Sequence, residues 1–187
     1  MLAERIHPPP STMLTSLHAA SGLPYSIDWS AWVAKDRAVL TFVRRGGQLL
    51  LIHKKRGLGA GKYNAPGGRI EPGETPEAAA VRETQEELCV TPTGLRPAGR
   101  LCFAFVDGYS IDCHVFAAAD AMGTATETDE AVPFWCAEDA IPYGRMWADD
   151  RIWLPLLLEG RLFEAWFVFD GDLMLWHELR VGAPSQS

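Results

Sequence analysis

Residues 68–90 constrain the fold most strongly, because they join a glycine-containing loop to an unusually acidic helical pattern. Thr75 is a favourable residue at a helix N-cap, since its hydroxyl accepts a hydrogen bond from a free backbone N–H. Pro76 suits the first turn, where a missing N–H costs nothing. The sequence therefore predicts a helix over residues 76–89.

One face of this predicted helix carries three carboxylates. At 3.6 residues per turn the acidic face comprises Glu83, Glu86 and Glu87, and the packing face comprises Val81, Thr84 and Leu88. An acidic helix face is usually only a solvated face. Here, however, it follows a Gly67–Gly68 loop whose backbone can approach phosphates closely. A hard divalent cation with oxygen ligands would relieve the repulsion between the carboxylates, so we predict a Mg²⁺ site.

The same segment resembles the Nudix box, G-x5-E-x7-R-E-U-x-E-E-x-G-U, in which U is apolar. The matching residues are Gly68, Glu74, Arg82, Glu83, Glu86 and Glu87. Thr84 departs from the pattern at a position that is usually aliphatic, and Cys89 replaces the second glycine. Glycine would end the helix cheaply in a left-handed conformation that cysteine adopts only with strain. We therefore expect the turn into Val90 to differ from that of the family.

The resemblance extends over residues 37–180. The segments that carry it are HKKRGLGAGKYNAPGGR (53–69), FAFVDGYSIDCHVF (103–116), ETDE (127–130), MWADD (146–150) and WLPLLLEGRLFEAWFVFDG (153–171). Together they are similar to the MutT-homologue branch of Nudix enzymes, which hydrolyses oxidised purine nucleoside triphosphates such as 8-oxo-dGTP. The resemblance implies an α/β/α Nudix sandwich with a mixed β-sheet, and products that are a nucleoside monophosphate and pyrophosphate.

Catalytic roles follow from this resemblance. The implied metal ligands are Glu83, Glu86 and Glu87, together with backbone carbonyls of Gly67 or Gly68, and the implied ion is Mg²⁺ with Mn²⁺ as a substitute. Glu74 and Arg82 would brace the loop against the helix. Glu130 resembles an additional acidic residue near the metal, although a solvated loop acid explains it equally well among its acidic neighbours.

A base pocket is implied by residues in three further segments. Asn64 resembles a base-binding asparagine, whose amide can both donate to and accept from a purine edge. Trp147 offers a stacking surface, and Asp149 and Asp150 can accept the N–H groups of a guanine-like edge, although either aspartate would also suit a helix N-cap. We expect one carboxyl of this adjacent pair to hold a proton near neutral pH. The remaining expected pocket residues are Leu58, Phe103, Phe105 and Ile111.

The rest of the chain predicts one compact domain with an extension. Strand patterns flank glycine turns at residues 38–54, 100–118 and 162–181, and a second helical pattern covers 149–158. We assign residues 37–187 to the Nudix domain. Residues 1–36 form an N-terminal extension that is partly docked, because the two tryptophans in DWSAW are poor residues to leave in water.

Net charge, apolar runs and cysteine spacing limit the kinds of partner and compartment that suit this chain. The formal net charge of -7 argues against a surface that grips a nucleic-acid polymer, while a free nucleotide remains compatible with a metal and local basic residues. No apolar run in the first 36 residues is long enough for a membrane helix. The four cysteines lack metal-ligand spacing, so we expect reduced thiols in a cytoplasmic protein. The oligomeric state is left open, and a monomer is compatible with the sequence.

Three functions are compatible with these features. The first is a Mg²⁺-dependent hydrolase of oxidised purine nucleoside triphosphates. The second is a Nudix pyrophosphatase for ADP-ribose or a dinucleoside polyphosphate, which would have no reason to share the base-reading set of Asn64, Trp147, Asp149 and Asp150. The third is a non-catalytic nucleotide sensor, which the complete acidic helix argues against.

Overall fold

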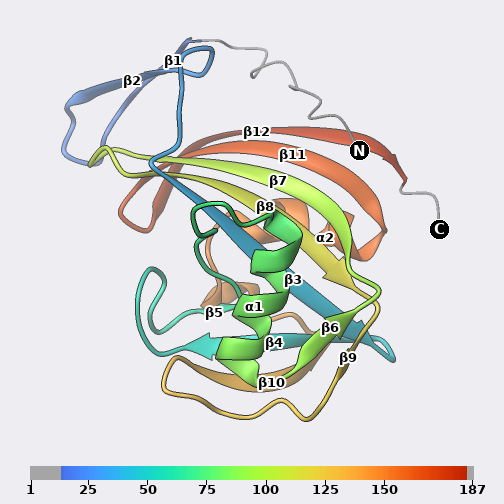
Figure 1. Cartoon of the computed structure of the whole chain (residues 1–187). Helices are drawn as coiled ribbons and strands as arrows, with labels where there is room; N and C mark the ends of the chain where they lie inside the picture. The colour runs from blue at the N-terminus through green and yellow to red at the C-terminus, as the bar shows by residue number, and fades with distance from the viewer. Residues whose placement is uncertain (1–13, 185–187) are drawn as a thin grey trace.

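An eight-stranded mixed sheet forms the centre of the molecule in the computed structural model, which describes residues 14–184 (Figure 1). Seven strands follow one another in the order β10-β4-β3-β8-β7-β11-β12, and β5 pairs with β4. The strands are β3 (Asp36–Arg45), β4 (Gln48–Lys54), β5 (Tyr63–Asn64), β7 (Arg96–Phe105), β8 (Ser110–Ala118), β10 (Ala131–Ala137), β11 (Arg161–Asp170) and β12 (Leu173–Pro184). The predicted hairpins are therefore present as β3–β4, β7–β8 and β11–β12.

Two parallel pairings make the sheet mixed. Strand β3 runs parallel to β8, and β7 runs parallel to β11, whereas the other neighbours are antiparallel. The second pairing sets Phe103 beside Phe167 and Phe105 beside Phe169. Because side chains alternate along a strand, these aromatic residues lie on one face of the sheet.

Helix α1 (Pro76–Leu88) and helix α2 (Asp150–Leu158) lie on opposite faces of the sheet (Figure 1). The α1 face packs through Val39, Ala79, Ala80 and Phe116. The α2 face packs through the larger apolar cluster that contains Phe42, Leu101, Trp153 and Phe167. This arrangement is the predicted α/β/α sandwich. No helix within the described part of the chain is long and apolar enough to cross a membrane.

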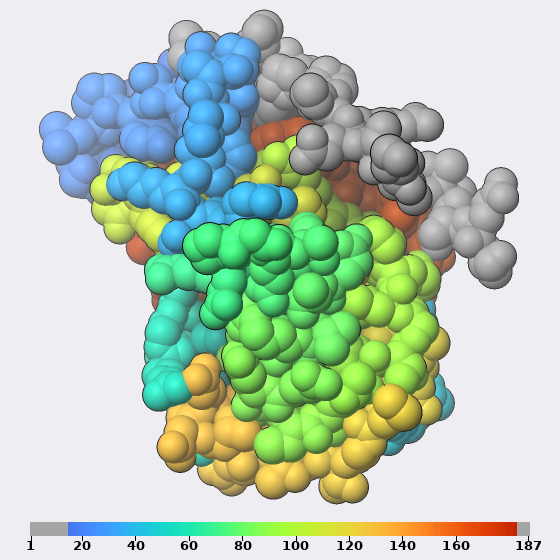
Figure 2. Space-filling model, viewed as in Figure 1, coloured from blue at the N-terminus to red at the C-terminus, as the bar shows by residue number. Residues whose placement is uncertain are grey.

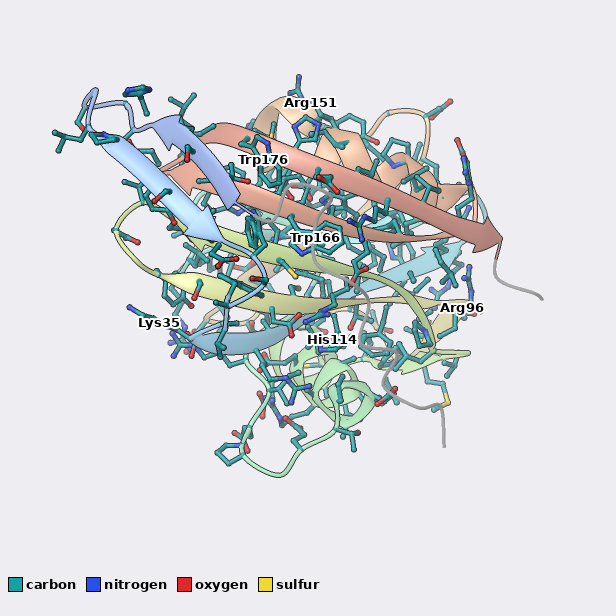
Figure 3. All side chains as sticks on the ribbon, turned by 90° about the horizontal axis from the view of Figure 1, so that it is seen from above. Lys35, Arg96, His114, Arg151, Trp166 and Trp176 are labelled. Carbon is teal, nitrogen blue, oxygen red and sulfur yellow. The ribbon has the colours of Figure 1, made fainter. Side chains whose placement is uncertain are left out.

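A hairpin of β1 (Leu14–His18) and β2 (Pro24–Asp28) covers the β7–β11–β12 end of the sheet on the α1 side (Figures 1 and 2). Trp29 is buried directly after this hairpin, and its ring stacks on Trp176 with centroids 5.8 Å apart. Figure 3 shows Trp166 and Trp176 on the side of the sheet where the hairpin lies. The HPPPST segment lies outside the described residues, and the boundary at residue 36 stays a prediction.

The ends of α1 follow simple capping chemistry. Thr75 is the N-cap residue, and its hydroxyl accepts a hydrogen bond from the backbone N–H of Ala78 at 3.2 Å. At the other end Cys89 adopts φ 61° and ψ 25°, the left-handed conformation that glycine adopts cheaply. The expectation that cysteine would alter this turn was therefore wrong. In this conformation the Cys89 N–H donates to the carbonyl of Gln85 at 2.9 Å.

Smaller elements complete the chain. They are β6 (Thr91–Thr93), which pairs antiparallel with β9 (Asp120–Met122), and a 3₁₀ helix over Tyr143–Arg145 that precedes α2. Thr84, which departs from the aliphatic pattern of the box, is fully buried in α1. Its hydroxyl donates to the carbonyl of Ala80 at 2.7 Å, so this buried polar group is satisfied within the helix.

Candidate active site

A cavity of about 440 Å³ opens between the Gly67–Gly68 loop and the start of α2. It is lined by every residue expected in the base pocket, namely Leu58, Asn64, Phe103, Phe105, Ile111, Trp147, Asp149 and Asp150. Gly67, Gly68 and Glu130 line the same cavity. One concave site thus adjoins both the predicted base-reading groups and the glycine loop beside α1.

Asp149 and Asp150 are buried at the inner end of this cavity, each only 2% exposed. The Oδ2 atom of Asp149 accepts a hydrogen bond from Trp153 Nε1 at 2.8 Å, whereas its Oδ1 atom is buried without a partner. Asp150 Oδ2 accepts from the backbone N–H of Trp147 at 2.9 Å. Although Asp149 stands at the N-cap position of α2, its side chain makes no capping hydrogen bond. Asp149, which lines the cavity, therefore keeps one carboxylate oxygen that accepts no hydrogen bond from the described residues.

Burial controls the protonation of this pair. Loss of water raises the pKa of the Asp149 carboxyl to about 6, against a smaller lowering by the Trp153 hydrogen bond. Burial also raises the pKa of Asp150 well above its ordinary value, and the neighbouring charge of Asp149 raises it further. The pair therefore retains a proton at a pH where solvated carboxyls have lost theirs.

Trp147 and Asn64 flank the aspartates. Phe105 and Phe169 meet the Trp147 ring edge-on, with centroid distances of 6.4 and 5.7 Å, so its orientation is fixed by packing. The Oδ1 atom of Asn64 accepts from the backbone N–H of Ala65 at 2.8 Å. That bond directs the side chain and leaves the amide nitrogen to donate.

The three carboxylates on the acidic face of α1 are exposed to different degrees. Glu86 is exposed, Glu83 is partly buried and Glu87 is 1% exposed. Glu87 Oε1 pairs with Lys54 Nζ at 3.0 Å, and its Oε2 accepts from the backbone N–H of Gly67 at 2.9 Å. Glu87 is buried because two donors outside the helix satisfy its carboxylate.

Arg82 ties the helix to the preceding loop. Its guanidinium binds both carboxylate oxygens of Glu74 at 2.9 Å and the carbonyl of Arg69 at 2.9 Å. These hydrogen bonds lower the pKa of Glu74 to about 2. Arg82 also contacts Glu83 at 2.7 Å and Glu86 at 3.1 Å. The geometry is that of the predicted brace, extended to two of the predicted metal ligands.

Glycine is required where the loop meets the helix. A Cβ atom on Gly68 would lie 2.4 Å from the carboxylate of Glu83, and one on Gly67 would lie 2.1 Å from the carbonyl oxygen of Val39. Burial is the main cause that raises the pKa of Glu83, and the charges of Glu87 and Glu86 add to it. Carboxylate oxygens and loop backbone therefore crowd together at this point.

The donor chemistry of this region fits a hard divalent cation, because it offers carboxylate and carbonyl oxygens. Among residues 14–184, however, no three His, Cys, Asp or Glu side chains converge on one point as a metal site would require. Arg82 and Lys54 occupy the carboxylates instead. Cation binding would thus exchange these protein cations for the metal. Glu130 lines the cavity and forms an ion pair with Arg56.

Several cavity residues were not singled out from the sequence. Lys54, Arg56 and Arg69 bring positive charge to the lining, and Tyr109 and Phe169 add aromatic surface. The basic run HKKR was a visible signal for the first two. Phe169 had no local signal, because the parallel pairing of β7 with β11 places it there. At the rim, Asp36 accepts from the Tyr109 hydroxyl at 2.7 Å and pairs with Arg69 at 3.0 Å.

Comparison with known proteins agrees with this geometry. The model of the NUDIX domain matches residues 34–157. The chain belongs to the NUDIX family. This NUDIX protein is 42% identical to the oxidized purine nucleoside triphosphate hydrolase of Danio rerio, over 75% of its own length and 91% of that protein. It is 41% identical to the enzyme of the same name from Mus musculus, over 75% of its own length and 92% of that protein.

The crystal structure of a MutT protein from Bacillus halodurans also resembles this NUDIX protein. The two superpose with a TM-score of 0.70 at 25% identity, covering 77% of this chain and 97% of that one. Family membership identifies the protein as a hydrolase with the NUDIX fold. Hydrolases of this family act on nucleotides with a divalent metal, which accords with the carboxylates and glycine loop beside the cavity.

Proposed function

We propose that the protein hydrolyses oxidised purine nucleoside triphosphates, with 8-oxo-dGTP as the first candidate, and so removes damaged nucleotides from the cellular pool. The observation that carries this proposal is that Asp149, a buried residue of the cavity lining, has an Oδ1 atom without a hydrogen-bond partner. A buried carboxylate oxygen without a donor is costly, and a purine N–H group would satisfy it. The names of the two similar hydrolases support the same substrate class.

The base would bind at the inner end of the cavity. Trp147 would stack on the purine plane, while Asn64 would donate to an acceptor on its edge. Asp149 and Asp150, with their raised pKa values, can present one acceptor and one donor. An oxidised guanine edge and a hydroxyadenine-type edge could both be read by such a pair.

The phosphates would extend toward the Gly67–Gly68 loop, where Lys54, Arg56 and Arg69 line the cavity. Glu83, Glu86 and Glu87, with carbonyl oxygens of the glycine loop and with Glu130, would hold Mg²⁺ or, in its place, Mn²⁺. When bound, the metal supplies charge neutralisation on the phosphate oxygens and a positioned water. Arg82 and Glu74 would hold the glycine loop against α1 during the reaction.

Water attack on the triphosphate would break one phosphoanhydride bond. The products are the nucleoside monophosphate and pyrophosphate, so the reaction needs no redox partner. We also propose a cytoplasmic location and a free nucleotide, not a nucleic-acid polymer, as the partner. All four cysteines are free thiols, as a reducing compartment would keep them.

The test is kcat/KM for 8-oxo-dGTP, 2-hydroxy-dATP, dGTP, 8-oxo-GTP and ADP-ribose, with and without Mg²⁺. Turnover is measured by pyrophosphate release for the triphosphates and by AMP formation for ADP-ribose. We expect an oxidised purine triphosphate to lead the series and all turnover to require the metal. A series led by ADP-ribose would refute the substrate assignment while leaving the protein a NUDIX hydrolase. Nucleotide binding without turnover on any of these compounds would instead indicate a sensor.

A further inference from the structure

Gly59 and Lys62 support the Trp147 ring, and neither residue lines the cavity. A Cβ atom on Gly59 would lie 2.9 Å from Trp147 Nε1, so the loop backbone packs directly against the indole. Gly59 has φ +79°, a conformation that L side chains rarely adopt. The Nζ atom of Lys62 lies over the same ring, 4.9 Å from its centroid. Lys62 is not among the residues that line the cavity, whereas Trp147 is.

The position of Lys62 is fixed from several directions. Its ammonium pairs with Asp172 at 2.8 Å, in the turn that joins β11 to β12. Its backbone N–H donates to the carbonyl of Gly59 at 2.9 Å, and its own carbonyl accepts from Lys54 at 3.0 Å. The side chain is 24% exposed, so the ammonium is partly withdrawn from water. Lys62 therefore cannot leave the indole without losing an ion pair.

A cation over one face of an indole is attracted by the negative face of the ring quadrupole, and it draws π-electron density toward itself. The opposite face then becomes a better acceptor for an electron-rich aromatic ring. We propose that Lys62 is a positioning residue for base recognition, which holds Trp147 and strengthens its stacking on the purine. This inference rests on the proposed function, because it requires Trp147 to be the stacking platform.

The experiment measures the equilibrium affinity of the metal-free protein for the product-type ligand 8-oxo-dGMP by calorimetry, so that turnover is not needed. Lys62→Met removes the charge and keeps an apolar stem, and Lys62→Arg keeps a cation that can also pair with Asp172. The chain offers a matched control in Arg45, whose guanidinium lies 4.9 Å from the centroid of Trp135 and pairs with Asp120. Arg45→Met removes an equivalent cation from a tryptophan that does not line the cavity.

We expect Lys62→Met to weaken 8-oxo-dGMP binding about three- to tenfold, as a partly desolvated cation–π contact would imply. Lys62→Arg should bind within about twofold of the native protein, and Arg45→Met should leave affinity unchanged while lowering the melting temperature as much as Lys62→Met does. In steady state Lys62→Met should raise KM with kcat unchanged, because the base is held equally in the ground and transition states.

The variant Trp147→Ala distinguishes the proposed role of Lys62 from the proposed role of Trp147 as the stacking platform for the base. If this variant loses affinity while Lys62→Met binds as tightly as the native protein, the inference is refuted and the base platform stands. If Trp147→Ala also binds normally, the platform itself is wrong, and the inference falls with the proposed function. Equal losses in Lys62→Met and Arg45→Met would show a general stability effect and would likewise refute the role of Lys62.

Discussion

Replacing Asp149 with asparagine should change how the stability of the protein depends on pH. The carboxyl is 2% exposed and has one hydrogen-bond donor, Trp153 Nε1, for its two oxygens. Asparagine keeps the shape and an oxygen for that donor but cannot ionise. Any free-energy cost of ionising this buried carboxyl should therefore disappear in the variant.

The magnitude follows from the shift in pKa. Folding raises the pKa of Asp149 from 3.8 to about 6, so the folded state binds its proton more tightly than the unfolded state does. Its contribution to stability is fully present below pH 3.8 and is lost as the pH rises through about 6. At about 1.4 kcal/mol per tenfold change, the full loss is roughly 3 kcal/mol, of which about 2.4 kcal/mol falls between pH 4 and pH 8. Removing the Asp149 charge also removes one cause that raises the pKa of Asp150. Ionising Asp150 then costs less, so this effect also favours the variant at high pH.

The assay is urea unfolding of the metal-free native and Asp149→Asn proteins between pH 4 and pH 8. The difference in unfolding free energy should move by about 2–3 kcal/mol in favour of the variant as the pH rises. An unsatisfied amide N–H could offset all values by about 1–3 kcal/mol, but that offset does not vary with pH. Glu159→Gln, at a side chain 58% exposed, serves as control. Parallel pH profiles for the native protein and Asp149→Asn would refute the reasoning.

Four further outcomes are expected. Glu86→Gln should lower turnover at least about 10²-fold, yet leave the metal-free melting temperature unchanged because Glu86 is exposed. Glu87→Gln should also abolish turnover. Calorimetry should show that its free energy of unfolding is lower by about 1–3 kcal/mol, because Lys54 loses its partner charge. Cys89→Gly should stabilise the protein by about 1 kcal/mol in urea unfolding, whereas Cys89→Ala, which keeps the left-handed strain, should not. Trp147→Ala should raise KM about tenfold or more for both 8-oxo-dGTP and 2-hydroxy-dATP, and an unchanged KM would contradict stacking.

The fold could be predicted where local signals decide it. Glycine turns with flanking apolar alternation marked the three hairpins of the main sheet, and capping chemistry at Thr75 marked the start of α1. The parallel pairings of β3 with β8 and of β7 with β11 had no such signal, because no turn connects these strands. The hairpin at residues 14–28 was also missed. Its register sets Ser16 opposite Ser26, so the alternation that predicts a strand is weak there.

The acidic helix shows where periodicity misleads. The helical wheel grouped Glu83, Glu86 and Glu87 correctly, and from it one expects mutual repulsion that a neutral substitution would relieve. In the structure Arg82 donates to two of these carboxylates and Lys54 pairs with the third, so removing a charge also removes an attractive contact. Lys54 lies 33 residues before Glu87 in the chain, a separation that no helical pattern can span.

Glu87 and Asp149 are two of the buried carboxylates at the site, and comparing them explains why Asp149 implies a ligand that donates a hydrogen bond. Glu87 is satisfied on both oxygens, by Lys54 and by the backbone of Gly67, so its burial costs the free protein little. Asp149 is satisfied on one oxygen only, and its raised pKa reflects the remaining cost. A ligand that donates an N–H to Asp149 recovers that cost on binding, whereas the same donor gains nothing at Glu87. We therefore expect discrimination between purine edges to depend on Asp149, where an absent donor leaves a buried oxygen unsatisfied.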